Sequence, residues 1–405
     1  MSIAQLLAVM PTDPATQARQ VMRLSVLDWV ACGVAGRAEP VSRAVHGMVM
    51  AEGGAAQASL FGGGAAPMRA AALVNGATSH ALDYDDTHFA HIGHPSVAVV
   101  SAALAVGQAR NAPLDAVIEA ALAGCELSVR LGMRLGRGHY QVGFHQTATA
   151  GAFGAAYAAA RLLSGDIAHH TTALALVSTA AAGLKSQFGT MGKPYNAGLA
   201  AANGVQAALL AQGFDAPAQP LSGANGFFAT HHADGDWEQP SGWMMTDVSH
   251  KFHACCHGLH ATLEALATLT LPNASQIAQI DLRTHPRWMT VCNQSAPDTG
   301  LGAKFSYGQV TALAVLGHDT AALSSYTDAL AQTPDVVTLR ERVTVTADPN
   351  LSETQAHVRI TTSGGHILRA DHDLASPMTL SDRTARVRAK ARALIGADKA
   401  EAVWG

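Results

Sequence analysis

Hydrophobic residues recur at helical spacing through the first half of the chain. Between about residues 15 and 230 the apolar positions follow an i, i+3, i+4 pattern, and Gly or Pro separates one run from the next. The pattern predicts helices over 15–34, 42–51, 66–82, 96–110, 114–135, 147–164, 167–184 and 195–212. Many of these positions are Ala or Gly, whose small size lets helices approach closely. The sequence therefore predicts a large, mainly α-helical domain.

The pattern changes after Pro240. Apolar and polar residues alternate, with many β-branched side chains, over 277–283, 343–347, 354–361 and 366–371. Ser363-Gly364-Gly365 lies between the last two runs and predicts a hairpin turn. Residues 258–269 have helical spacing. We therefore expect a smaller α+β domain after the helical one.

Residues 379–394 return to the helical pattern, with Ser381 as the expected N-cap. This last helix carries a basic cluster formed by Arg383, Arg386, Arg388, Lys390 and Arg392. Runs of like charge on a helix are most often solvated, so we interpret the cluster as an exposed helix face.

Composition excludes several classes of protein. The formal net charge is −4 and the chain has no long basic run, which argues against a nucleic-acid-binding protein. Arg19 is the first basic residue, so the positive region of a signal peptide is missing and we expect a cytoplasmic protein. The apolar residues 146–160 fall short of the roughly 20 that span a membrane, and we interpret them as a buried helix. Five cysteines without CxxC spacing predict free thiols.

The densest group of polar side chains is Asp83-Tyr84-Asp85-Asp86-Thr87-His88, followed by His91 and His94, in a chain with only 14% charged residues. Neighbouring carboxylates and imidazoles shift one another's pKa, so such a group can hold protons near neutrality. Pro95 suits the first position of a helix, which places His94 on a loop at a helix start. The density predicts a reaction site.

A metal site is the rival interpretation of this segment. His88, His91 and His94 form a His-x-x-His-x-x-His pattern, and Asp83, Asp85 and Asp86 precede it. However, catalytic metal sites usually gather ligands from several segments, whereas these are crowded into one. We therefore expect chemistry without a metal.

Further candidates lie downstream. Lys193 follows Gly189-Thr190-Met191-Gly192 and precedes a predicted helix, and a helix N-terminus with an ammonium suits a carboxylate. His145 precedes an Ala/Gly-rich helix; on the sequence alone a core histidine is the commoner reading. Lys251 and Cys256 lie in a second group of His, Lys and Cys residues over 250–260. Cys256 could be a nucleophile beside His257, but no feature requires a covalent intermediate.

Five segments in order resemble the signatures of one family. They are Ala81–His88 with His94-Pro95-Ser96, Gly143-Phe144-His145-Gln146-Thr147, Phe188–Pro194, Lys251–His260 and Ala303-Lys304-Phe305-Ser306. Together they resemble the MmgE/PrpD family, which contains 2-methylcitrate dehydratase, cis-aconitate decarboxylase and iminodisuccinate epimerase. The resemblance spans nearly the whole chain.

The resemblance implies a discontinuous helical domain, 1–245 and 373–405, with an α+β lid over 246–372. It also implies chemistry without a metal or organic cofactor. The catalytic residues it implies are His94, His145, Lys193, Lys251 and Asp83, and the substrate-binding residues we expect are Thr87, Asn196, Gln309, Lys304 and Cys256. Gln309 stands where many relatives have tyrosine, and Asn196 replaces a frequent histidine, which puts the substrate in question.

We therefore expect a lyase that removes a proton alpha to a carboxylate of a small polycarboxylic acid. The lysines would hold carboxylates while the imidazoles move protons. Dehydration of the 2-methylcitrate type is our first choice; the alternatives are epimerisation of a dicarboxylate, decarboxylation of the cis-aconitate type, and a non-catalytic binder of organic acids. We expect a homodimer without nucleic-acid or membrane partners.

Overall fold

The computed structural model describes residues 2–13, 15–217, 219–236 and 240–404. The chain divides into two compact units. The helical unit comprises Met1–His250 and Val387–Gly405, and the α+β unit comprises Lys251–Arg386. In this division residues 373–386 belong to the α+β unit, whereas the sequence placed them with the helical domain. The mainly α-helical content with few strands agrees with the predicted fold class.

In chain order, the helical unit begins with ten elements. They are α1 (Ile3–Ala8), α2 (Thr16–Gly36), α3 (Pro40–Glu52), β1 (Ala58–Ser59), β2 (Ala65–Ala66), α4 (Met68–Ser79), α5 (Ser96–Arg110), α6 (Leu114–Gln141), α7 (Gln146–Leu163) and α8 (Ile167–Val177). It continues with η1 (Lys185–Gln187), α9 (Gly192–Leu210), α10 (Phe227–Thr230), η2 (Met244–Asp247) and α18 (Ala397–Trp404). Helix α17 (Leu380–Ile395) contains the second boundary between the units.

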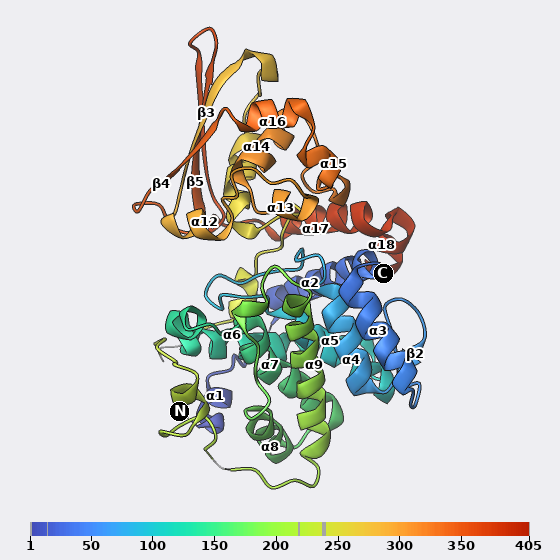
Figure 1. The fold of residues 1–405 in the computed structure, drawn as a ribbon. Coiled ribbons are helices and arrows are strands. Elements are labelled where there is room, and N and C mark those ends of the chain that lie inside the picture. The colour runs from blue at the N-terminus through green and yellow to red at the C-terminus, as the bar shows by residue number, and fades with distance from the viewer. Residues whose placement is uncertain (1, 14, 218, 237–239, 405) are drawn as a thin grey trace. The chain divides into compact units, whose positions relative to one another are not determined.

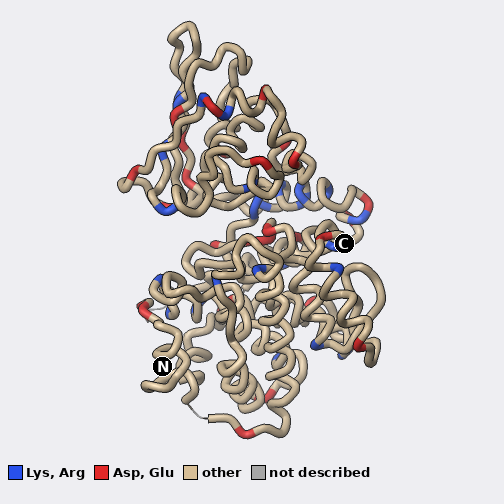
Figure 2. Tube along the Cα trace, in the orientation of Figure 1, with Lys and Arg blue, Asp and Glu red and all other residues tan. Residues whose placement is uncertain are grey.

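Helix α7 lies at the centre of the helical unit. It packs against α5, α6 and α9, and α4 packs against α9 (Figure 1). Gly76 and Gly198 allow the α4–α9 approach, because a Cβ on Gly198 would lie 2.5 Å from the carbonyl oxygen of Leu73. Long stretches of these helices carry no charged residue (Figure 2). The Ala- and Gly-rich pattern therefore produces close helix packing, as predicted.

The predicted solvated basic face of the last helix is wrong at Lys390. This side chain on α17 is buried, and its Nζ lies 2.6 Å from Asp28 Oδ1. Lys390 also donates a 2.5 Å hydrogen bond to the carbonyl oxygen of Tyr84. A lysine is buried in this way only when its charge is paired. Helix α17 is thus anchored to the segment that carries Asp83 and Asp85.

The N-cap prediction for α17 is also wrong. Ser381 lies inside the helix, and the Thr379 hydroxyl accepts a 3.1 Å hydrogen bond from the Asp382 backbone N–H. Thr379 also donates to the Asp382 carboxylate at 2.7 Å. A side chain three residues before the N–H that it accepts has the geometry of a helix cap.

The α+β unit contains one sheet and several short helices. Its elements are η3 (His257–Leu259), α11 (His260–Ala267), η4 (Ala274–Gln276), β3 (Ile277–Thr284), α12 (Pro286–Val291), α13 (Gly300–Ala303), α14 (Tyr307–Val315), η5 (Leu323–Ser325), α15 (Asp328–Ala331), α16 (Pro334–Arg340), β4 (Val343–Ala347), β5 (Gln355–Thr362) and β6 (Ile367–Asp373). The strand order is β4-β3-β5-β6.

The sheet is mixed. Strands β3 and β4 are parallel, with Ile280 opposite Val343, and the other neighbours are antiparallel. The predicted turn at 363–365 joins β5 and β6. Every second residue of β5 is buried, and α11 packs against β5 and β6. The four strands were predicted from this alternation, while the short helices α12, α13, α15 and α16 were not.

All five cysteines are free thiols, as expected. The predicted helix over 167–184 ends earlier, at Val177, and the chain then passes beside the candidate site. Among the described residues, none of the helices combines the length and the apolar character needed to cross a bilayer.

Candidate functional site

The loop between α4 and α5 carries most of the site, and its backbone is strained. Asp83 and Ile92 have φ values of 51° and 55°, in the left-handed region. Aspartate tolerates this region, but it is unfavourable for a β-branched residue such as Ile92. The His88 N–H donates a 2.9 Å hydrogen bond to Gly93 O, and Thr87 and Ser249 exchange two backbone hydrogen bonds. Backbone held in this way is frequent at functional sites.

Five side chains form a row in which basic and acidic groups alternate. We call this row the charge chain. The Lys193 Nζ lies 2.7 Å from Asp83 Oδ1, and this oxygen lies 3.2 Å from His94 Nε2. His94 Nδ1 lies 3.0 Å from Asp85 Oδ2, and Asp85 Oδ1 lies 2.8 Å from His80 Nδ1. The side chains of Lys193 and Asp83 are 17% and 27% exposed, whereas that of His80 is 0% exposed. The charge chain therefore runs from an accessible end at Lys193 to a buried end at His80.

The buried end has a defined state of charge. Burial alone raises the pKa of Asp85, but His80 and His94 beside it lower that pKa well below its ordinary value. Burial lowers the pKa of His80, although Asp85 opposes this. The arrangement is therefore a neutral His80 that donates its Nδ1–H to an ionised Asp85. His94 has a carboxylate oxygen facing each ring nitrogen, which stabilises the ring when both nitrogens carry protons.

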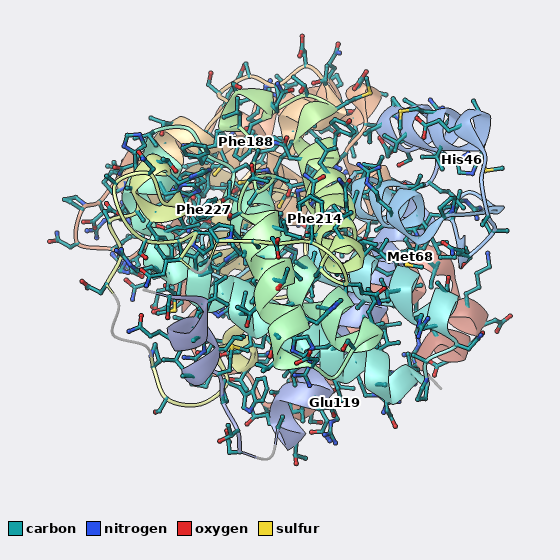
Figure 3. The ribbon with its side chains drawn as sticks, turned by 90° about the horizontal axis from the view of Figure 1, so that it is seen from below. His46, Met68, Glu119, Phe188, Phe214 and Phe227 are labelled. Carbon is teal, nitrogen blue, oxygen red and sulfur yellow. The ribbon has the colours of Figure 1, made fainter. Side chains whose placement is uncertain are left out.

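His145 is the second imidazole of the site and lies at the N-cap of α7. Its backbone N–H donates a 2.9 Å hydrogen bond to Gly183 O. Gly183 has a φ of 150°, and a Cβ there would lie 2.6 Å from Ala148. Only glycine fits this close approach, which fixes the backbone of His145. Its ring lies 6.1 Å from the His80 ring and 4.8 Å, edge-on, from Phe188, which is labelled in Figure 3.

The hydrogen bonds around Asn196 set the protonation of His145. The Asn196 amide nitrogen donates to Leu184 O at 3.2 Å, which identifies it as the nitrogen, and it lies 3.4 Å from His145 Nδ1. His145 Nδ1 is therefore an acceptor, and the ring proton belongs on Nε2. Burial, reinforced by the Lys193 ammonium, lowers the pKa of His145 well below its ordinary value. His145 is thus a neutral imidazole.

Lys193 lies in the first turn of α9, whereas the sequence placed it just before this helix. Its ammonium faces Asp83 and lies 5.3 Å from the centre of the Phe188 ring. The Thr190 hydroxyl accepts a 3.1 Å hydrogen bond from the Gly192 N–H at the start of this helix. The cationic side chain, and not a free helix end, is therefore the group suited to bind a carboxylate.

The other predicted residues are divided between the two units. Thr87 lies in the helical unit, with its hydroxyl 3.5 Å from Ser249 O. Lys251, Cys256, Lys304 and Gln309 lie in the α+β unit. Within it, the Cys256 N–H donates to Lys304 O at 2.9 Å, and the Gln309 side-chain oxygen accepts from Arg340 at 2.8 Å. Contact of these residues with a substrate stays a prediction.

A metal ion could be held by part of the charge chain. Among the described residues, His80, Asp83, Asp85 and His94 each offer one ligand atom, and these atoms lie within 4.8 Å of one another. His88 is directed elsewhere, with Nε2 3.0 Å from Met244 O. The Lys193 ammonium 2.7 Å from Asp83 is unfavourable for a cation at the same carboxylate, because like charges repel.

Sequence reasoning missed His80. It precedes the Asp-rich segment by three residues, at the end of α4, and the turn brings its ring against Asp85. The only signal was the spacing of His80 and Asp85 within one short stretch, and a lone histidine at a helix end is more often structural. Asp85 was noted as part of the cluster but was not assigned a role.

Comparison with known families identifies the chain. Residues 2–240 match the MmgE/PrpD N-terminal domain, and residues 253–402 match the MmgE/PrpD C-terminal domain. The chain belongs to the MmgE/PrpD family. Cis-aconitate decarboxylase of Aspergillus terreus is 30% identical over 282 residues, covering 64% of this chain and 56% of that protein. The cis-aconitate decarboxylase-like protein oryM of Aspergillus oryzae is 27% identical over 283 residues, covering 64% of this chain and 58% of that protein.

These alignments leave much of each relative uncovered. The aligned part is little more than half the length of the curated relatives. The MmgE/PrpD assignment supports a lyase-type function.

Proposed function

We propose that the protein is a cofactor-independent lyase that transfers a proton to or from carbon in a small polycarboxylic acid. The observation that carries the proposal is the charge chain with His145 beside it. It offers an accessible ammonium, an imidazole between two carboxylates and a second, neutral imidazole. These are the parts that carboxylate binding and general acid-base catalysis require.

The two imidazoles have different roles in this proposal. His94, held between Asp83 and Asp85, is the proton donor in the resting enzyme. His145 is neutral, so it accepts a proton or donates a hydrogen bond from Nε2. Lys193 binds a substrate carboxylate, which competes with Asp83 for the ammonium. Lys251 and Lys304 as further carboxylate ligands stay a prediction.

Decarboxylation of an unsaturated tricarboxylate is the reaction that we place first. Both reported relatives are named for cis-aconitate decarboxylation. Loss of carbon dioxide leaves the electrons of the broken C–C bond on the substrate, and a proton must then be added at carbon. A protonated His94 supplies such a donor. Dehydration of the 2-methylcitrate type, our first choice from the sequence, uses the same groups but also requires removal of a carbon-bound proton.

Proton NMR in deuterated water tests the proposal. The full chain is incubated with cis-aconitate, 2-methylcitrate, citrate or iminodisuccinate. We expect cis-aconitate to lose carbon dioxide and to take up deuterium at carbon. Water loss from 2-methylcitrate would replace decarboxylation by dehydration. Absence of turnover and of deuterium exchange with all four acids, in a folded protein that binds them, would favour a non-catalytic binder and contradict the proposal.

A further inference from the structure

The buried end of the charge chain cannot touch a substrate directly. The side chains of Asp85 and His80 are 3% and 0% exposed, and both lie behind His94. Asp85 uses one oxygen for each imidazole: Oδ1 accepts from His80 Nδ1 at 2.8 Å, and Oδ2 lies 3.0 Å from His94 Nδ1. Asp85 can therefore act on the reaction through His94, which faces its second oxygen.

The pair acts on both the orientation and the proton of His94. The rings of His80 and His94 meet edge to face, with centres 4.5 Å apart and planes at 73°, which restricts rotation of the His94 ring. A carboxylate oxygen 3.0 Å from Nδ1 favours a proton on that nitrogen, because the negative charge attracts it. Nε2 is then the nitrogen that can exchange a proton on the accessible side, where Asp83 and Lys193 lie.

We propose that His80 and Asp85 are positioning residues that hold the His94 ring in place and keep a proton on its Nδ1. The proposal rests on the proposed function, in which His94 transfers a proton. His80 acts by donating its Nδ1–H to Asp85, which holds the carboxylate against His94. Without this donor, Asp85 loses one of its two partners in a buried environment, where an unsatisfied carboxylate oxygen is unfavourable.

Two variants of His80 separate positioning from packing. The amide nitrogen of asparagine takes nearly the place of imidazole Nδ1, so His80→Asn keeps a donor for Asp85 while His80→Ala removes it. We expect His80→Ala to lower kcat by roughly 10- to 100-fold, as loss of a supporting hydrogen bond typically does, with KM changed by less than about threefold. His80→Asn should recover most of kcat. Asp85→Asn should lower kcat more, up to about 10,000-fold, because it favours the wrong tautomer of His94.

Nitrogen-15 NMR of labelled histidines gives a second measurement that needs no turnover. The His94 signals are assigned by their absence in His94→Ala, among the 20 histidines of the chain. We expect Nδ1 of His94 to carry a proton in the wild type and in His80→Asn, and to lose this preference in Asp85→Asn. A wild-type His94 with an unprotonated Nδ1 would overturn the proposal whether or not a substrate is found.

The kinetic outcomes are equally decisive. Unchanged kcat in His80→Ala and Asp85→Asn would show that the pair does not act on His94. Equal losses in His80→Ala and His80→Asn, together with equally lowered unfolding temperatures, would show a packing role and would also overturn the proposal. If the wild type turned over none of the four acids, the proposed function would fail, and the NMR measurement would still decide the position of the proton.

Discussion

Asp85 and Asp86 are neighbours in the sequence and almost equally buried, yet their surroundings have opposite effects. Asp85 lies between two imidazoles, which hold its pKa well below the ordinary value. Asp86 accepts a 2.6 Å hydrogen bond from the Ser96 hydroxyl at the start of α5. Burial, with Asp28 nearby, raises the pKa of Asp86 to about 7. Burial is common to both residues, so the partners decide which of them is ionised.

The two carboxylates mark two sides of one loop. We call the surroundings of Asp85, with His80 and His94, the imidazole side, and those of Asp86, with Asp28 and Lys390, the helix side. The imidazole side continues through Asp83 to an accessible lysine. The helix side is closed, because Lys390 is itself buried between Asp28 and Tyr84. We therefore propose that the imidazole side serves the reaction and that the helix side serves stability.

The largest effect should come from removing an imidazole. His94→Ala and His145→Ala are expected to lower kcat by about 100- to 10,000-fold, the range of general acid-base catalysis, with smaller changes in KM. Steady-state kinetics measure both constants. His46→Ala on α3, outside the site (labelled in Figure 3), is the matched control and should leave kcat unchanged. Near-normal kcat in both folded site variants would show that the imidazoles are structural.

The helix side should respond in stability. Lys390→Met removes the cation paired with the buried Asp28 carboxylate, and breaking such a pair typically costs about 3–5 kcal/mol. We expect a clearly lower midpoint of thermal unfolding, measured by circular dichroism. The double variant Asp28→Asn/Lys390→Met leaves no unpaired charge and should recover most of the loss. An unchanged midpoint in Lys390→Met would contradict the buried pair.

Lys193 tests the accessible end of the imidazole side. Loss of a charged hydrogen-bonding partner is worth about 1.5–3 kcal/mol, so Lys193→Ala should raise KM by roughly 10- to 100-fold. A further fall in kcat would measure stabilisation of charge that develops during the reaction. Lys185→Ala is a suitable control, because Lys185 donates to Tyr140 O and lies outside the charge chain. Equal KM values for the two variants would remove Lys193 from the site.

Asp86 should make stability depend on pH in a defined direction. Its folded pKa of about 7 lies above the usual unfolded value of about 3.9, so the folded state binds the extra proton. This contribution to stability is fully present below the unfolded pKa and is lost as pH rises through the folded one. Asp86→Asn should therefore flatten the fall in unfolding free energy between about pH 4 and 7. If Asp86→Asn left the pH dependence of the denaturation curves unchanged across this range, the assignment would be refuted.

Removal of metals should have no effect. We predict a reaction without a metal, although His80, Asp83, Asp85 and His94 have the spacing of a ligand set. Activity is expected to survive dialysis against a strong chelator. Loss of turnover that one divalent metal restores would turn the imidazole side into a metal site.

The long helices and the strands of the four-stranded sheet could be predicted from the sequence, because each has a simple period. Helix α5 and strand β4 have the predicted limits, and strands β3, β5 and β6 differ by one or two residues, while β1 and β2 were not predicted. The helix over 167–184 was predicted too long, since the apolar run continues beyond Val177 into chain that lies beside Phe144. Periodicity shows which residues avoid water but not where a buried segment ceases to be helical.

The site was predicted less completely. Four candidates were identified from the sequence and lie close together in the helical unit: His94, His145, Lys193 and Asp83. Lys390 was interpreted as solvated, because its partners Asp28 and Tyr84 lie more than 300 positions away in the sequence. A contact between residues so distant in the chain leaves no local pattern.

The most direct test of the account compares kcat in Asp85→Asn and Asp86→Asn, measured side by side with the substrate that the NMR screen selects. Both substitutions keep the shape of the side chain and remove one carboxylate from the same loop. We predict that Asp85→Asn lowers kcat by at least about 100-fold, because His94 loses its positioning partner, while Asp86→Asn changes kcat by less than about threefold. Similar kcat values in the two variants would contradict the division of the loop into a chemical and a structural side.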